Sequence, residues 1–367
     1  MMQTAIGRAV QREALSREIA RTAMELVLSG EATPAQIAAL AVALRMKGET
    51  ADEIAGMAEA MRQRVPPIRT RRAPLLDTCG TGGDNAGTFN ISTTVALVTA
   101  SCGVAVAKHG NRAVSSRTGS ADVLESLGVR IDLTPEGAAR SLDLLGITFL
   151  FAPNYHTALR HAAGPRREIG VRTVFNVLGP LTNPAGASRQ LLGVYSDTLV
   201  GTVAEVLRQL GSERAWVVHG RDGLDELTVF AKSHVAEIDG RSMREFEVDP
   251  AQLGLAHTDR GGVAGGDAPT NAARVRAVLS GEPGAARDIV VLNSAAALVV
   301  AGVAGRLEDG VARARRDRRR PRGREARRAR GVSRLTGAEA GCSVHAAAGR
   351  CPSRRRSAPA AAPRSPV

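Results

Sequence analysis

Two glycine-rich loops, each following a short apolar run, carry the residues best suited to chemistry. The first reads Asp77-Thr-Cys-Gly-Thr-Gly-Gly-Asp84 and the second reads Lys108-His-Gly-Asn-Arg-Ala-Val-Ser-Ser116. Because glycine has no side chain, the backbone can approach an anion closely and turn its amide hydrogens toward it. Either loop alone is more typical of a tight turn with a helix cap than of a phosphate-binding loop, since short glycine-rich motifs often occur by chance. The pair predicts a site for the two ends of one polyanion, such as a sugar pyrophosphate.

Polar side chains surround both loops. The first loop opens an apolar helix, and a helix N-terminus presents free amide hydrogens and a positive dipole end to phosphate. Its added donors are Thr88, Asn90, Ser92 and Thr93. The second loop supplies a cation, an imidazole, an amide and hydroxyls from Lys108, His109, Asn111, Ser115 and Ser116, with Ser120 one helical turn on. Taken singly, His109 is as typical of a structural hydrogen-bonder as of a catalytic group. Arg112 is as typical of a local ion pair as of a ligand contact.

A pair of adjacent acids forms a third element. Asp225 and Glu226 follow the apolar run from Trp216 to Val218. Two carboxylates at a strand end, beside a pyrophosphate site, favour Mg²⁺, a hard cation held by one or two carboxylates plus substrate oxygens. The Ser92 hydroxyl is a further hard oxygen that could touch such a metal. From spacing alone, an acidic surface turn is equally consistent.

The first 64 or so residues predict helices only. One helix covers Glu18 to Leu28 and stops at Gly30, and a second opens at Thr33-Pro34 and runs through Leu44. Thr50 or Asp52 caps a third. The Pro- and Arg-rich stretch from 65 to 74 is the predicted hinge. We therefore expect a small all-helical domain over 1–70.

Short apolar runs alternate with amphipathic stretches beyond the hinge. The amphipathic stretches include 121–127 and 199–210, and the apolar runs are 75–77, 104–107, 148–151, 190–195, 215–218 and 227–230. This alternation predicts an α/β domain, over 71–315, with a mostly parallel sheet flanked by helices.

The charge of the chain is concentrated at one end. The 367 residues carry a net charge of +13, and from Arg313 to Val367 there are 17 Arg and three acids, so the body before this tail is nearly neutral. A basic nucleic-acid-binding face on the body is therefore not expected. Four scattered Cys predict neither a disulfide scaffold nor a paired-cysteine metal site. No run suggests a membrane span or signal peptide, so a cytoplasmic location is the default expectation.

Residues 316–367 have an Arg-, Ala- and Pro-rich composition that cannot bury a core. A nucleic-acid-binding arm and a solvated, disordered tail are two interpretations. A third rests on residues 305–315, which open an amphipathic helix that stops in mid-pattern. A shifted reading frame in a GC-rich gene would produce this, and three Lys among 49 basic residues fit such a gene. We hypothesise that a native C-terminal helix has been replaced.

Taken together, these blocks resemble the anthranilate phosphoribosyltransferases of tryptophan biosynthesis, which belong to the nucleoside phosphorylase-like phosphoribosyltransferases. The resemblance covers roughly residues 15 to 312, and so many ordered blocks make coincidence very improbable. It rests on the segments 80–84, 90–93, 108–116, 119–125, 172–184 and 223–226.

The resemblance implies transfer of phosphoribose from 5-phosphoribosyl-1-pyrophosphate (PRPP) to the amine of anthranilate, with Mg²⁺ and release of pyrophosphate. It also implies a homodimer formed through the helical domain, which a segment near 165–185 links to the larger domain. By position, PRPP would meet Gly80, Gly83, Asp84, Thr88, Asn90, Ile91, Ser92, Thr93, Lys108, His109, Gly110, Asn111, Arg112, Ala113, Val114, Ser115, Ser116 and Ser120. Anthranilate would meet Gly80, Asn111 and Arg166, and the metal would meet Ser92, Asp225 and Glu226. His109 and His156 match positions that line the aromatic-acid channel.

The implied chemistry agrees with what these residues offer. An amine of low basicity needs no strong base, so alignment of two substrates and stabilisation of the departing pyrophosphate suffice. We expect no dedicated nucleophile, with Lys108 and His109 as contributors. The rivals are a pyrimidine nucleoside phosphorylase, a nucleic-acid-binding relative of the same fold and an inactive product of a damaged gene. Asn111 with Arg166, and the acid pair, favour the transferase.

Overall fold

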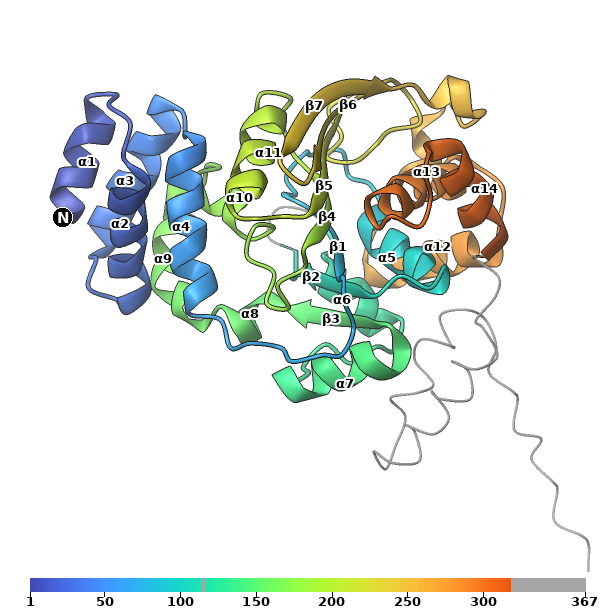
Figure 1. The fold of residues 1–367 in the computed structure, drawn as a ribbon, viewed down its shortest axis with the longest axis horizontal. Helices are drawn as coiled ribbons and strands as arrows, with labels where there is room; N and C mark the ends of the chain where they lie inside the picture. The colour runs from blue at the N-terminus through green and yellow to red at the C-terminus, as the bar shows by residue number, and fades with distance from the viewer. Residues whose placement is uncertain (114–116, 318–367) are drawn as a thin grey trace, which may run out of the picture.

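The computed structural model describes residues 1–113 and 117–317, which form a helical bundle beside a sheet flanked by helices (Figure 1). The helices are α1 (Met2–Val10), α2 (Arg17–Ser29), α3 (Pro34–Lys47), α4 (Ala51–Gln63), α5 (Ile91–Ser101), α6 (Ser120–Ser126), α7 (Pro135–Leu145), α8 (Ala152–Tyr155), α9 (Arg160–Ile169), α10 (Phe175–Leu178), α11 (Leu199–Gln209), α12 (Ala268–Ser280), α13 (Ala285–Val300) and α14 (Leu307–Asp317). The strands are β1 (Leu76–Gly80), β2 (Val106–Gly110), β3 (Ile147–Phe151), β4 (Arg189–Gly193), β5 (Arg214–Gly220), β6 (Ser233–Asp239) and β7 (Ser242–Val248).

The N-terminal helices begin and end where their capping residues predict. Gly30 ends α2 in the left-handed conformation. Thr33 caps α3 with Pro34 at the first helical position, and Thr50 rather than Asp52 caps α4. Each cap oxygen accepts a backbone N–H that the first helical turn leaves without a partner. The bundle ends at Gln63, and the predicted hinge between it and β1 contains neither helix nor strand.

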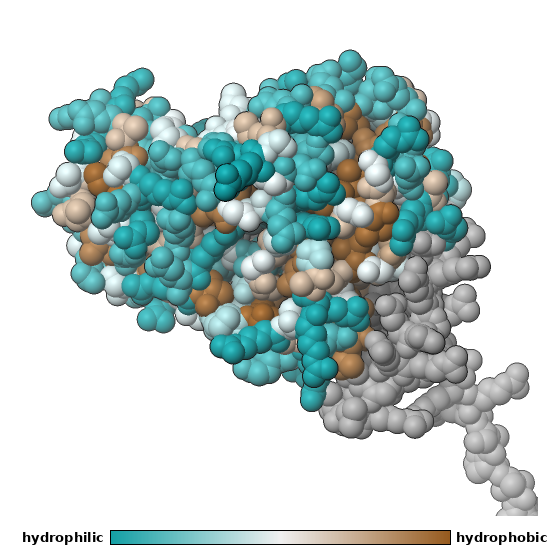
Figure 2. All heavy atoms as spheres, in the orientation of Figure 1, coloured by the Kyte–Doolittle hydropathy of each residue, from teal (hydrophilic) through white to brown (hydrophobic). Residues whose placement is uncertain are grey.

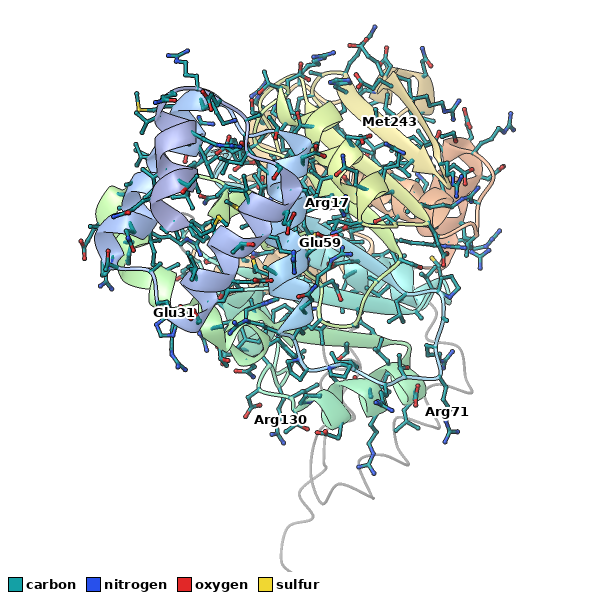
Figure 3. The ribbon with its side chains drawn as sticks, turned by 60° about the vertical axis from the view of Figure 1, so that its left-hand side comes forward. Arg17, Glu31, Glu59, Arg71, Arg130 and Met243 are labelled. Carbon is teal, nitrogen blue, oxygen red and sulfur yellow. The ribbon has the colours of Figure 1, made fainter. Side chains whose placement is uncertain are left out.

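The bundle packs closely and is tied to the larger part of the molecule. Arg17 of α2 forms an ion pair with Glu59 of α4 (Figure 3). At Gly56 the two helices touch, because a Cβ there would overlap the Arg17 carbonyl oxygen. The Arg17 guanidinium also donates to Gln209 of α11, at 3.3 Å. Helix α9 packs on α2 and α3, and α10 packs on α4, so the segment predicted to link the two parts does contact the bundle.

The sheet has the strand order β3-β2-β1-β4-β5-β6-β7. The first five of these strands are parallel, and β6 and β7 form an antiparallel extension. The expectation of a mostly parallel sheet is confirmed. The expectation of a strand over 227–230 is wrong: this segment is a loop, buried from Leu227 to Val229. Its apolar side chains still pack into the core. The backbone of Leu227 bonds to the side chain of Asn293 instead of to a neighbouring strand.

Helices cover both faces of the sheet. One core cluster joins α5, α6 and α12–α14 to the strands, and a second joins α11 and the bundle to the opposite face (Figure 1). Apolar residues gather on the surface mainly around the C-terminal helices, whereas the bundle presents a largely hydrophilic face (Figure 2). Among the described residues no single helix is long and apolar enough to cross a membrane; α12 and α13 reach that length only as a pair bent by 70°.

The strand order reverses between β1 and β4, which are neighbours in the sheet. Strands β1, β2 and β3 are laid down outward on one side, and β4 and β5 on the other. At such a point the loops after two adjacent strands diverge to opposite faces and leave a crevice at the carboxyl ends, where open α/β sheets bind their ligands. Both glycine-rich loops start at this edge, after β1 and β2.

Helix α14 continues to Asp317, so the helix expected over 305–315 is present. The predicted tail over 316–367 lies almost wholly outside the described residues.

Candidate active site

The ends of β1 and β4 meet through glycines. Gly80 and Gly193 are the last register pair of these strands, and the Thr81 N–H donates to the Gly193 carbonyl at 2.9 Å. The acidic loop, residues 221–228, lies directly above them. A Cβ at Gly193 would overlap the Asp225 carbonyl oxygen, and one at Gly80 would stand 2.5 Å from Asp225 Oδ2. Both glycines are therefore needed for the carboxylates to reach the crevice.

Asp225 binds the first glycine-rich loop directly. The Gly82 N–H donates to Asp225 Oδ2 at 2.8 Å, and the Asp225 N–H points at Asp84 Oδ2 at 3.5 Å. An amide of this loop therefore binds a carboxyl group of the protein itself; that the loop binds phosphate stays a prediction. Burial raises the pKa of Asp225 well above its usual range, and the neighbouring Asp84 and Glu226 raise it further.

Glu226 lies at the N-terminus of α5. It lies beside Ser92, in the first turn, where the helix dipole favours an anion, and hydrogen bonding from Ser92 acts to lower its pKa. Burial nevertheless raises the pKa of Glu226 to about 8, with Lys108 opposing the shift. Lys108 Nζ donates to the Thr78 carbonyl at 2.5 Å and to Ser92 Oγ at 3.3 Å. The structure therefore brings together Ser92, Lys108 and the acid pair.

The oxygens at this point fit a divalent cation. Asp225 and Glu226 are hard carboxylate ligands, and burial raises the pKa of both, so a cation would stabilise their charged forms. Within the described part of the chain, no group of three or more His, Cys, Asp or Glu forms a closed metal site. Two carboxylates and a hydroxyl, with ligand oxygens completing the shell, match the way Mg²⁺ is bound beside phosphates.

The second loop leaves β2 at Gly110 and is fastened at its far end. A Cβ at Gly110 would overlap Ser120 Oγ, which donates to the Asn111 carbonyl at 3.1 Å. Asp122 accepts the N–H groups of Ala113 and Gly119 at 3.1 and 2.8 Å. Arg112 forms exposed ion pairs with Asp122 and Glu125, in agreement with the interpretation of Arg112 as part of a local ion pair. The predicted ligands Val114, Ser115 and Ser116 lie outside the described residues.

The other predicted contacts around α5 differ in what their side chains do. Asn90 accepts from Asn271 Nδ2 at 3.0 Å and donates to the Thr118 carbonyl at 3.1 Å, so its amide braces the second loop. Ile91 is buried in the core and offers only its backbone to the crevice. Thr93 Oγ1 is buried without a hydrogen-bond partner among the described residues. Thr88 forms a β-bridge with Ala264.

The predicted acceptor side is lined by two imidazoles. The rings of His109 and His156 have centroids 5.1 Å apart. Burial lowers the pKa of His109 to about 3 and that of His156 to about 4, so both are neutral. His109 Nδ1 lies 3.1 Å from the Gly179 carbonyl and must donate to it, which leaves Nε2 as an acceptor. Both Nε2 atoms are buried without a partner in the described structure.

Arg166 comes from α9, on the bundle side. Its guanidinium lies 5.5 Å from the centroid of the Phe175 ring, and burial lowers its pKa. No hydrogen bond of the described structure joins Arg166 to Gly80 or Asn111, the other predicted anthranilate contacts. Asn111 itself is exposed, with Oδ1 accepting the Arg112 N–H at 2.7 Å.

Several residues that hold the site were not singled out from the sequence. Asp77 is fully buried in β1 and accepts the His109 N–H at 3.1 Å and Asn183 Nδ2 at 2.8 Å. An acid within an apolar strand was the signal available for it. Arg172 stacks 4.5 Å from the Tyr195 ring centroid and lies against Gly83. Nothing local in the sequence marks Gly193, because the residue that packs against it, Asp225, is 32 positions away along the chain.

Comparison with known proteins agrees with this geometry. The helical bundle domain of a glycosyl transferase family matches residues 3–65, and the a/b domain of that family matches residues 72–318. The anthranilate phosphoribosyltransferase of Moorella thermoacetica is 55% identical over 312 residues, which cover 85% of this chain and 92% of that protein. This chain belongs to the anthranilate phosphoribosyltransferase family.

Solved structures of the anthranilate phosphoribosyltransferase family share the whole fold. That of the Thermus thermophilus enzyme is 43% identical, with a TM-score of 0.83, and the similarity covers 93% of this chain and 99% of that chain. The Saccharomyces cerevisiae enzyme in complex with PRPP and Mg is 26% identical, with a TM-score of 0.81, covering 94% and 98%. The family match ends at residue 318, so the Arg-rich segment beyond it lies outside both family domains.

Proposed function

We propose that this chain transfers the phosphoribosyl group of PRPP to the amine of anthranilate, giving N-(5-phosphoribosyl)anthranilate and pyrophosphate, the second step of tryptophan biosynthesis from chorismate. The observation that carries the proposal is the acid pair at the point where the strand order reverses, with Asp225 bonded to an amide of the glycine-rich loop and Glu226 beside Ser92 at the start of α5. The identity with named transferases supports the same reaction. It does not favour the phosphorylase.

Mg²⁺ fits the residues present and would be held by Asp225, Glu226 and the Ser92 hydroxyl, with oxygens of PRPP. When bound, it stabilises the charge that develops on the leaving pyrophosphate. The yeast relative binds PRPP and Mg in its crystal structure, which supports this choice.

The protein's own groups bind and align the donor. The amides of the loop after Gly80 and the first turn of α5 present N–H groups to phosphate oxygens, and they are held in place before the ligand arrives. Lys108 is buried beside Ser92 and adds a positive charge close to the acid pair. Such preorganised donors act most strongly where water is excluded. The Gly82 N–H is bonded to Asp225 here and would be free for the donor if Asp225 instead held Mg²⁺.

The acceptor side binds a planar aromatic acid. Arg166 offers a guanidinium for a carboxylate, beside the ring of Phe175. The unpartnered Nε2 of the neutral His109 offers an acceptor for an N–H group, and the Nε2 of the neutral His156 is a second unpartnered ring nitrogen. A neutral imidazole does not compete with Arg166 for the carboxylate, and it can orient an amine without deprotonating it fully.

A fluorescence assay with purified protein tests the proposal. Anthranilate fluorescence should fall only when PRPP and Mg²⁺ are both present, and EDTA should stop the change. Thymidine with inorganic phosphate serves as the matched assay for the rival phosphorylase. Phosphorolysis of thymidine without anthranilate consumption would overturn the assignment.

Three further properties are proposed with the reaction. The chain forms a homodimer through its helical bundle, acts in the cytoplasm and does not use nucleic acid as a partner. Light scattering on a size-exclusion column would measure the first, with a monomer at micromolar concentration as the contrary result. Truncation after residue 317 should abolish any DNA binding and leave the described site intact; retention of DNA binding would contradict this.

A further inference from the structure

Helix α13 reaches the acidic loop with one fully buried amide. The Leu227 N–H donates to Asn293 Oδ1 at 3.0 Å, and Asn293 Nδ2 donates to the Leu227 carbonyl at 2.8 Å. Nδ2 also donates to the Ile289 carbonyl, one turn back in the same helix, at 2.9 Å. The amide is therefore used completely, and it binds both backbone polar groups of a single residue 66 positions away.

That residue follows Glu226 directly. In a strand, a neighbouring strand would take the N–H and carbonyl of Leu227, but this segment is a loop. Asn293 replaces the missing sheet partner. Because both groups of Leu227 are tied to a rigid helix, the peptide joining it to Glu226 has one orientation, which fixes where the Glu226 side chain leaves the backbone.

Helix α13, which carries Asn293, is packed against α14 on another side. Helix α14 crosses α13 at Gly310, where a Cβ would stand 2.8 Å from the Ala295 carbonyl oxygen. Asn293 is one of the fully buried polar residues of the chain, and α13 is buried along nearly its whole length. A buried polar side chain without its partners is costly, so this one has a structural reason to keep its two bonds to Leu227.

We propose that Asn293 is a positioning residue for the acid pair: it fixes Leu227 so that Glu226 and Asp225 present their carboxylates together to Mg²⁺. The inference rests on the proposed function for the identity of the metal. It assigns a role in that site to the C-terminal helices, which supply none of the predicted ligands.

Two variants on adjacent positions of α13 separate this role from a general effect on the core. Asn293→Leu keeps the branching and the number of side-chain heavy atoms and removes both bonds to Leu227. Ser294→Ala is the matched control, since Ser294 is equally buried and its hydroxyl has no hydrogen-bond partner among the described residues. Asn293→Ser retains a small polar group and serves if the leucine variant does not fold.

The first measurement is the Mg²⁺ concentration that half-saturates turnover at fixed PRPP and anthranilate. We expect it to rise at least fivefold in Asn293→Leu, less in Asn293→Ser and not at all in Ser294→Ala, with turnover partly restored by excess Mg²⁺. A merely structural role would lower the amount of folded enzyme and leave the half-saturating concentration unchanged. An unchanged value in folded Asn293 variants overturns the proposal.

The second measurement needs no activity. Hydrogen–deuterium exchange followed by mass spectrometry should show faster exchange in peptides covering 221–230 for the Asn293 variants, with β4, β5 and α13 as protected as in the unsubstituted protein. Exchange that rises equally throughout the core, or that rises equally in Ser294→Ala, counts against a specific clamp. If the unsubstituted protein consumes no anthranilate, the proposed function fails, and the exchange data still decide whether Asn293 holds the loop.

Discussion

The two sides of the site handle buried charge in opposite ways. The donor side, at the ends of β1 and β4, gathers Asp225 and Glu226, whose pKa values burial raises. The acceptor side holds His109 and His156, whose pKa values burial lowers to about 3 and about 4. Desolvation disfavours the charged form in both places. It therefore favours protonated carboxyl groups on the donor side unless a cation is bound, and neutral imidazoles on the acceptor side.

This difference separates the tasks of the two substrates. On the donor side, Asp225 and Glu226 form a buried acid pair that the Gly82 amide and Lys108 only partly compensate, and a divalent cation is the partner we propose for it. The proposed acceptor side instead contains two neutral imidazoles and one guanidinium, groups that would suit an aromatic acid. Substitutions on the donor side should therefore change metal dependence, and those on the acceptor side should change anthranilate binding or pH response.

The largest effect is expected from the double variant Asp225→Asn with Glu226→Gln. Loss of both carboxylates should lower Mg²⁺-dependent turnover by about 10²–10³-fold, the size of effect typical for removal of a main charge-stabilising group. The fold should persist, since the amides are similar in shape and carry no charge to bury. Steady-state rates across a Mg²⁺ series, with circular dichroism, check both points. Asp239→Asn, at the exposed end of β6, is the control; unchanged Mg²⁺ dependence in the double variant would contradict the metal assignment.

Gly193→Ala tests the close approach of the acidic loop to the sheet. The added methyl overlaps the Asp225 carbonyl, so the loop must move, at a cost of about 1–3 kcal/mol in unfolding free energy. We also expect a higher half-saturating Mg²⁺ concentration. Denaturant unfolding and the Mg²⁺ series measure the two effects. Gly7→Ala, which meets nothing within 4 Å, should show neither; equal behaviour of the two variants would refute the packing argument.

On the acceptor side, Arg166→Gln should raise KM for anthranilate about 10–100-fold, the value of a lost hydrogen bond to a charged group. KM for PRPP should change little, because the donor is bound by the loops. Initial rates with each substrate varied in turn give both constants. Arg167→Gln, an exposed neighbour on α9, provides the reference. Equal changes in both KM values would mean that the two sides are not separate.

The smallest effect on turnover, and a clear one on stability, is expected from His156→Gln. In the folded protein the pKa of His156 is about 4, below its unfolded value, so the unfolded chain binds more protons between pH 6.5 and 4. Its contribution to stability is full above pH 6.5 and is lost as the pH falls toward 4, about 3 kcal/mol at most. The variant should flatten this loss relative to the unsubstituted protein. Parallel stability curves from pH 4 to 8 would disprove it.

Local signals were sufficient wherever a residue and its reason lie within a few positions. The caps at Thr33 and Thr50 and the glycine stop at Gly30 satisfy helix ends from adjacent residues, so the pattern could find them. The alternation of apolar runs gave the parallel sheet. It failed at 227–230, because a buried apolar run reads alike in a strand and in a loop whose partner is a side chain 66 residues away.

The sequence by itself determined the residue types of the site: glycines for anion binding, a Lys, and adjacent carboxylates for a hard cation. Only the tertiary structure decided which of them act together. Lys108 and Ser92 meet Glu226 because β1, β2 and the acidic loop end at one edge of the sheet, and the Asn90 amide also braces the second loop. Burial decided the rest, since the charge state of an acid or an imidazole depends on the water removed around it, and no spacing along the chain records that.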